Sequence, residues 1–194
     1  MKLSIIKSIF FVIAIGTLLS FDLPNNWFKA GSNPECYEMG IDKGVGPEGK
    51  NAATIKSAGK KVKGFGTLMQ SCLAEKYLGK KIKMSGYVKS TDVKGWAGLW
   101  LRVDDDATNR AMAFDNMQNR PIVKTTDWKK YEIVLDVPFK ADGLAYGALL
   151  VGKGQIWFSD ITFEIIGDIV PLGTKECIVC TKKLKEPSNL NFTE

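Results

Sequence analysis

The stretch GWAGLWLRVDDD, residues 95–106, combines two tryptophans, an arginine and three aspartates. If it forms a β-strand, its side chains alternate between two faces. One face is an ordinary apolar core face, formed by Ala97, Leu99, Leu101 and Val103. The other face carries Trp96, Trp100, Arg102 and Asp104. A tryptophan ring offers a flat apolar platform for the C–H face of a sugar, and the charged groups offer hydrogen bonds to its hydroxyl rim. This face is therefore a candidate binding surface for a small polar ligand.

Neighbouring segments supply candidate partners for this face. Asn116 shares a strand face with Phe114, Gln70 is a polar residue in the apolar run GTLMQSCL, and Arg120 precedes Pro121, which favours an extended backbone. The predicted ligand-binding set is Gln70, Trp100, Arg102, Asn116 and Arg120. A structural interpretation stays open as well. Trp100 and Arg102 are compatible with a stacked cation–π pair under a loop, and Arg120 with an ion pair to Asp115 that fixes a loop.

Most catalytic motifs are missing from the chain. It contains no histidine, which excludes Ser-His-Asp and Cys-His catalysis, and it has no G-x-S-x-G motif. GVGPEG at 44–49 matches G-x-G-x-x-G, but Pro47 interrupts it, and Asn51 stands where a phosphate-binding loop needs Ser or Thr. Paired carboxylates remain as an alternative means of glycoside hydrolysis, although DDDATN has the composition of a turn. We expect a protein that is not an enzyme.

The elements that position these residues are short strands. Alternating patterns bounded by turn signals predict strands at 36–41, 52–57, 66–74, 81–91, 97–104, 110–116, 129–137, 144–151 and 155–166. Residues 75–78 suit a single helical turn, and the sequence shows no strand–helix–strand alternation. This pattern predicts an all-β fold, an antiparallel jelly-roll β-sandwich.

Composition and charge agree with one globular domain. Hydrophobic residues make up 45% of the chain and charged residues 25%, which is normal for a protein with a core. The formal charge is +6, and the lysines are spread along the chain rather than gathered in a block. We therefore expect no nucleic-acid partner.

The first 20 residues differ from the rest. Lys2 and Lys7 precede an uncharged apolar run, 8–21, which is short for a membrane-spanning helix of about 20 apolar residues. This pattern predicts a signal peptide, cleaved after Gly16 or Ser20, or an uncleaved N-terminal anchor. The anchor would be the only membrane contact. The expected location is secreted, periplasmic or cell-surface.

Four cysteines and a polar C-terminal stretch complete the chain. Export permits disulfides, and Cys177 and Cys180 suit a local bond or free thiols. A zinc site would require Cys36 and Cys72 to converge on this CIVC motif, which we do not expect. Residues 168–194 are polar and rich in lysine, and they are expected to form a flexible tail.

Several stretches, in order, carry a resemblance to a known family. They are GFGTLMQS (64–71), WAGLWLRVD (96–104), AFDNMQNRPI (113–122), TTDWKKYEIVLDVP (125–138) and GKGQIWFSDITFE (152–164). Together they resemble the carbohydrate-binding-like, galactose-binding-type β-sandwich modules of bacteria, which often stand alone or are attached to AraC-type regulators. The resemblance covers about 27–167 and implies a jelly roll whose concave sheet meets a carbohydrate or another small polar ligand. No helix-turn-helix pattern is present, so DNA binding is not implied.

The resemblance also bears on a metal and on the chain end. Related sandwiches often hold a structural calcium, for which Asp160 matches the late acid, and Glu35 or Glu38 is the candidate for the early one, although the typical early motif is not clean. No other cofactor is implied. PSNLNFTE resembles the opening strand of a second module, with a coincidental tail as the alternative. A carboxylate-based hydrolase and an envelope protein-interaction or sensory domain remain the alternative functions.

Overall fold

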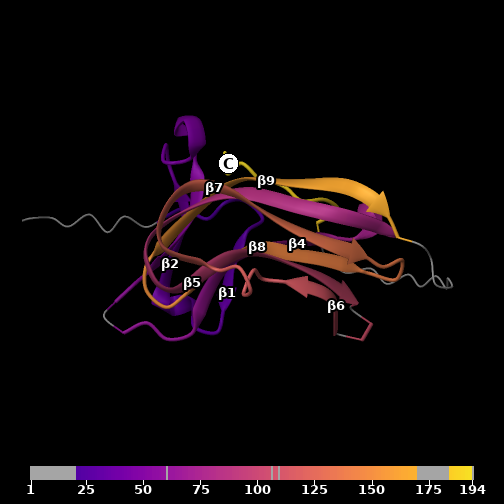
Figure 1. Ribbon diagram of the computed structural model, residues 1–194, viewed down its shortest axis with the longest axis horizontal. Coiled ribbons are helices and arrows are strands. Elements are labelled where there is room, and N and C mark those ends of the chain that lie inside the picture. The colour runs from indigo at the N-terminus through magenta and orange to yellow at the C-terminus, as the bar shows by residue number, and fades with distance from the viewer. Residues whose placement is uncertain (1–20, 60, 106, 109, 170–183, 194) are drawn as a thin grey trace, which may run out of the picture.

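The chain folds into strands connected by short turns (Figure 1). The computed structural model describes residues 21–59, 61–105, 107–108, 110–169 and 184–193. Its strands are β1 (Phe28–Gly31), β2 (Tyr37–Asp42), β3 (Ala52–Ser57), β4 (Phe65–Leu73), β5 (Lys80–Asp105), β6 (Arg110–Asp115), β7 (Ile122–Val137), β8 (Gly143–Val151) and β9 (Gln155–Asp168). Within these residues the only helices are single 3-10 turns at Pro34–Cys36, Pro47–Gly49 and Glu75–Tyr77. All neighbouring strands pair antiparallel, so the predicted all-β antiparallel class is confirmed.

The long strand β5 belongs to both layers of the sandwich. Its first half pairs with β7 and β9, and its second half pairs with β8 and β6. One layer therefore runs β1-β4-β8-β5-β6 and the other β2-β3-β9-β5-β7. Figure 1 shows β9 in the upper layer and β4, β8 and β6 in the lower one. The sequence predicted two strands here, because the polar residues between Thr91 and Trp96 interrupt the alternation.

The second half of β5 has the regular alternation that the sequence predicted. Its register with β8 runs without interruption from Trp96 opposite Val151 to Asp104 opposite Gly143. Leu99, Leu101 and Val103 are wholly buried in the core between the layers. Trp96, Trp100 and Arg102 therefore lie on the outer face of the β1-β4-β8-β5-β6 layer.

The outer face of the other layer is charged. Lys81 pairs with Asp136 at 3.1 Å, and Lys83 pairs with Glu164 at 2.8 Å, each across neighbouring strands. These lysines and their carboxylate partners form a charged face. The two outer faces thus differ in chemistry: this one carries lysine–carboxylate pairs, with the exposed Val134 opposite Lys83.

Residues 184–193 differ from the expected flexible tail. Phe192 is wholly buried, with its ring centroid 5.2 Å from those of both Trp27 and Phe158. Leu184 and Leu190 accept backbone hydrogen bonds from Leu73 and Ile161. Composition predicted a flexible tail because isolated apolar residues such as Leu190 and Phe192 in a polar stretch are too few to indicate that it packs on the core.

Two further predictions fall on other parts of the chain. The N-terminal segment 1–20, and Cys177 with Cys180, lie outside the described residues. Within the described residues, no helix has the length and apolar character that crossing a membrane requires.

Candidate ligand-binding site

A cavity of about 560 Å³ opens on the outer face of the β1-β4-β8-β5-β6 layer. Small-molecule sites commonly measure about 300–1,000 Å³, so its size suits a ligand of a few rings or sugar units. Its lining combines aromatic, aliphatic and a few polar side chains from five strands and the segments that follow β1 and β6. Three members of the predicted set lie here together, namely Trp100, Arg102 and Asn116.

Trp100 forms the floor of the cavity. It lies opposite Gly147 in the register with β8, and its indole N–H donates to Thr67 Oγ1 on β4 at 2.8 Å. The indole therefore reaches across β8, which lies between β5 and β4. The Trp100 side chain packs with Ala145 and Leu149 and is only 6% exposed. The expectation of an open aromatic platform at this position is therefore corrected.

The accessible aromatic surface comes from neighbouring residues. Phe114 is 52% exposed and lies opposite Arg102 on β6, with its ring centroid 6.5 Å from that of Trp100. Trp96 and Phe65 are half-buried and line the same cavity. Trp96 and Phe114 were placed on the right strand faces by alternation, but they were not included in the predicted set.

Arg102 is held by Asp104. Its Nε and Nη2 donate to the two carboxylate oxygens of Asp104 at 2.7 and 3.0 Å, which is the forked geometry of strong arginine–carboxylate pairs. The Arg102 side chain is 44% exposed and that of Asp104 15%. The guanidinium is therefore oriented before any ligand arrives, and its charge is compensated.

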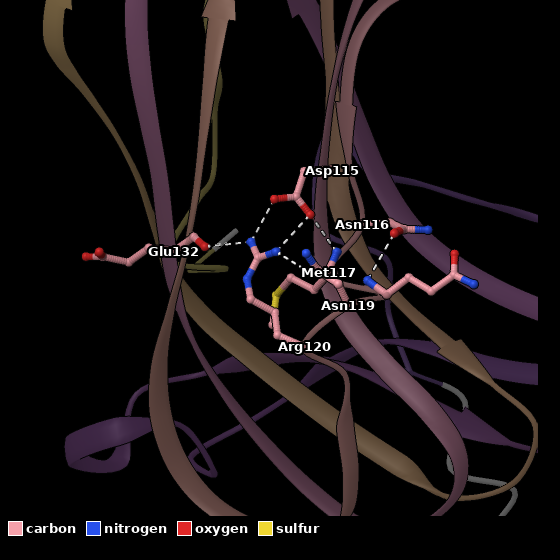
Figure 2. Close-up of polar contacts among 7 residues, drawn as sticks. Asp115, Asn116, Met117, Asn119, Arg120 and Glu132 are labelled. Carbon is pink, nitrogen blue, oxygen red and sulfur yellow. Dashed lines mark hydrogen bonds and ion pairs between the residues drawn. The ribbon is translucent and has the colours of Figure 1, made fainter.

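Asn116 is positioned by the loop that follows β6. Its Oδ1 accepts the backbone N–H of Gln118 at 3.1 Å, and its amide nitrogen points away from the loop (Figure 2). The loop passes close over β5 at Gly98. A Cβ atom there would lie 2.9 Å from the carbonyl oxygen of Asn116 and 3.0 Å from Met117 Cβ. Glycine at position 98 thus permits the approach that brings Asn116 to the cavity.

Arg120 stabilises this loop and does not line the cavity. It forms a fork with Asp115 at 2.7 and 3.1 Å and donates to the carbonyl oxygen of Glu132 at 3.0 Å (Figure 2). Burial raises the pKa of Asp115, but hydrogen bonds from Arg120 and from the Met117 N–H outweigh it and hold the pKa below its ordinary value. The geometry favours the structural interpretation of Arg120 over its predicted ligand contact.

Gln70 faces the core and not the cavity. On β4, Thr67 and Met69 line the cavity, and one residue further the side chain points to the opposite face. Gln70 Oε1 accepts hydrogen bonds from the Tyr146 hydroxyl and from the Ser188 N–H. Its placement beside Trp100 is therefore corrected. Strict alternation along the strand would have indicated this.

The predicted calcium ligand has a cation as its neighbour. Asp160 Oδ1 lies 3.8 Å from Lys50 Nζ, while Glu35 accepts from the Asn33 amide at an exposed position. In the part of the chain that the structure describes, no three acidic, cysteine or histidine residues gather in one place. The geometry gives a calcium ion at Asp160 no support.

Comparison with known proteins identifies similar folds but does not identify a ligand. No family model matches the chain. Over 169 residues, 87% of the chain, it is 41% identical to a Bacillus subtilis (strain 168) protein named uncharacterized HTH-type transcriptional regulator YbfP. The chain spans 56% of that relative's length.

Solved structures with a similar fold include carbohydrate-binding modules. The CBM22-1 xylan-binding domain of Xyn10C from Paenibacillus barcinonensis has a TM-score of 0.54 at 13% identity, over 76% of this chain and 90% of that one. The CBM22-1–GH10 modules of Clostridium thermocellum xylanase 10B, complexed with xylohexaose, also give 0.54, at 14% identity over 76% of this chain and 28% of that one. The enzymatically active domain of a bacteriophage CBA120 tailspike protein gives 0.55 at 14% identity, over 73% and 20% of the two chains. At these identities the likeness establishes a shared β-sandwich fold.

Proposed function

We propose that this chain is an exported, non-catalytic binding module that holds a carbohydrate in the cavity on its outer sheet face. The observation that carries the proposal is the combination of an exposed aromatic ring, Phe114, with an oriented guanidinium, Arg102, at one cavity. Aromatic rings pack on the apolar faces of sugar rings, and a planar fork binds pairs of oxygens. The fold, shared with domains whose names describe xylan binding, supports the proposal without identifying the sugar.

The charge distribution at the cavity favours binding over hydrolysis. Retaining and inverting glycosidases place two carboxyl groups about 5–10 Å apart across the scissile bond. Among the described residues that line the cavity none is acidic. The nearest candidates along the chain, Asp104 and Asp115, are each held in a fork with an arginine.

A second candidate function is a sensory module. The likeness to a protein named as an HTH-type transcriptional regulator favours it, because the chain matches about half of that protein. In this function the same cavity binds the ligand, and ligand binding changes the interaction of the module with another domain or protein. Pull-down from an envelope extract, with and without a bound saccharide, distinguishes it from a module that only attaches to its ligand.

A glycan array probed with the full chain tests the main proposal, followed by calorimetric titration of each saccharide that binds. The proposal is supported if a saccharide binds and the variant Phe114→Ala binds it more weakly. Phe139→Ala is a matched control, since Phe139 is 45% exposed and does not line the cavity. Release of reducing sugar from the bound saccharide would instead establish the hydrolase. Cell fractionation with sequencing of the mature N-terminus tests export.

A further inference from the structure

The side chains that line the cavity present more free hydrogen-bond donors than acceptors. Arg102 uses Nε and one N–H of Nη2 on Asp104, so three of its five N–H groups have no partner within the described chain. The Asn116 amide nitrogen likewise has none, because only its oxygen is engaged, by Gln118. Ser32 Oγ accepts the Phe65 N–H at 3.0 Å, which leaves its hydroxyl hydrogen to donate. Three side chains thus offer donors to a ligand.

The side-chain acceptors at the cavity are mostly engaged. Thr67 Oγ1 accepts from the Trp100 indole, donates to the Ala148 carbonyl at 2.7 Å and is almost wholly buried. No carboxylate is among the described residues that line the cavity. A sugar hydroxyl both donates and accepts, and a buried donor without a partner is unfavourable. The site therefore suits a ligand group that accepts without donating.

The compensated charge of Arg102 and the apolar wall of the cavity favour a neutral ligand group over an anion. Asp104 already compensates Arg102, so a ligand carboxylate would bring an unbalanced charge into the cavity, where its desolvation is costly. The remaining wall is apolar and includes Met69, Leu149 and Val151. A neutral carbonyl next to a methyl group matches both features.

We propose, on the basis of the proposed function, that the cavity selects saccharides that carry an acetyl group. The acetyl carbonyl accepts hydrogen bonds from Arg102 and Asn116, and the methyl group lies against the apolar wall. O-acetyl and N-acetyl sugars both offer this carbonyl and methyl group, and the ester, which has no N–H donor, matches the free donors of the site more fully.

Calorimetric titration of the full chain with matched ligand pairs tests this selection. Acetylated xylo-oligosaccharides are compared with the same sample after mild alkaline de-esterification, and triacetylchitotriose is compared with cellotriose. In at least one pair, the acetylated member is expected to bind at least about tenfold more tightly. The two pairs distinguish the ester from the amide.

Variants link the preference to the named donors. Asn116→Asp keeps the oxygen that accepts from Gln118 but replaces the free NH₂ with an acceptor, so the preference for the acetylated member is expected to fall toward onefold. Arg102→Gln should do the same, with Arg110→Gln as its control, since Arg110 is exposed on β6 and does not line the cavity. Circular dichroism of each variant confirms that it is folded.

The other outcomes are distinguishable. Equal binding within both pairs overturns the acetyl selection and leaves the proposed function intact. Tighter binding of trigalacturonate, weakened by added salt, overturns it in favour of an acidic sugar. Failure of every saccharide to bind overturns the selection together with the proposed function.

Discussion

The indole N–H of Trp100 on β5 donates to Thr67 Oγ1 on β4 at 2.8 Å, across the strand β8 that lies between them. Thr67 in turn donates to the Ala148 carbonyl on that middle strand. One buried hydrogen-bonded chain thus ties three strands together under the cavity. The floor of the site is therefore part of the rigid sheet, which holds the exposed rings around it in fixed positions.

Trp100→Ala is expected to lower the free energy of unfolding by about 3–5 kcal/mol, as for other nearly buried large side chains. It removes the ring and also leaves Thr67 without its donor. Urea unfolding followed by circular dichroism measures the loss. Phe114→Ala, which truncates a ring that is 52% exposed on the same cavity, should change stability by less than about 1 kcal/mol. Similar losses for both variants would contradict the assignment of Trp100 as the floor.

Phe114→Ala should weaken binding of a saccharide identified on the array by about 1–3 kcal/mol, because an exposed ring at the cavity serves as the stacking surface. Calorimetric titration measures the change. Phe139→Ala removes the same side chain at 45% exposure outside the cavity and should leave the affinity unchanged. Equal losses in the two variants would place the ligand elsewhere.

Much of the fold was predictable because strands repeat with a period of two. The pattern indicated the strands from β2 to β9 and put Trp100, Arg102 and Asn116 at one surface. It missed β1, whose four residues are too few for a pattern, and it divided β5, where charged and small residues precede Trp96. Local sequence alone does not show that one strand continues into a second sheet.

The errors at the candidate site have separate physical causes. Gln70 was selected for its polarity, although its position on β4 puts it in the core with Tyr146 and Ser188. Ser188, whose N–H donates to Gln70, lies far along the chain, so no local pattern predicts this hydrogen bond. The burial of Trp100 depends on Ala145 and Leu149, which pack with it from a strand distant in sequence.

Gly98→Ala should displace the loop that carries Asn116, because the added methyl would lie 2.9 Å from the Asn116 carbonyl oxygen. We expect a loss of about 1–3 kcal/mol in unfolding free energy, together with weaker ligand binding. Gly167→Ala is the control, since its nearest neighbour would be 3.9 Å away, at Lys81 Cβ. Urea unfolding and calorimetric titration report the two effects. If Gly98→Ala binds the ligand as tightly as the wild type, the loop that carries Asn116 is not part of the binding site.

Phe192→Ala should destabilise the sandwich by about 3–5 kcal/mol, although Phe192 lies only two residues before Glu194. Its ring fills a space in the core between Trp27 and Phe158. Thr193→Ala alters the neighbouring exposed residue and should be neutral. Thermal unfolding of the two variants compares them directly. Equal melting temperatures would show that residues 184–193 do not contribute to the core in solution.

The Asp115–Arg120 fork should make stability depend on acid pH. The folded-state pKa of Asp115 is lowered, so the unfolded chain binds this proton more readily. The stabilising contribution is therefore fully present above the unfolded pKa of about 3.9 and is lost as pH falls through the lower folded value.

Urea unfolding of wild type and Asp115→Asn, between about pH 7 and about pH 2, measures this contribution. The wild type should be the more stable at neutral pH, and the difference between the two should shrink steadily under acid. Arg120→Gln removes the hydrogen bonds that lower the pKa and should abolish the same acid-dependent part. In the double variant the two losses should not add, because both act through one ion pair. A difference that stays constant across the pH range would show that the Asp115 charge does not stabilise the loop next to the cavity.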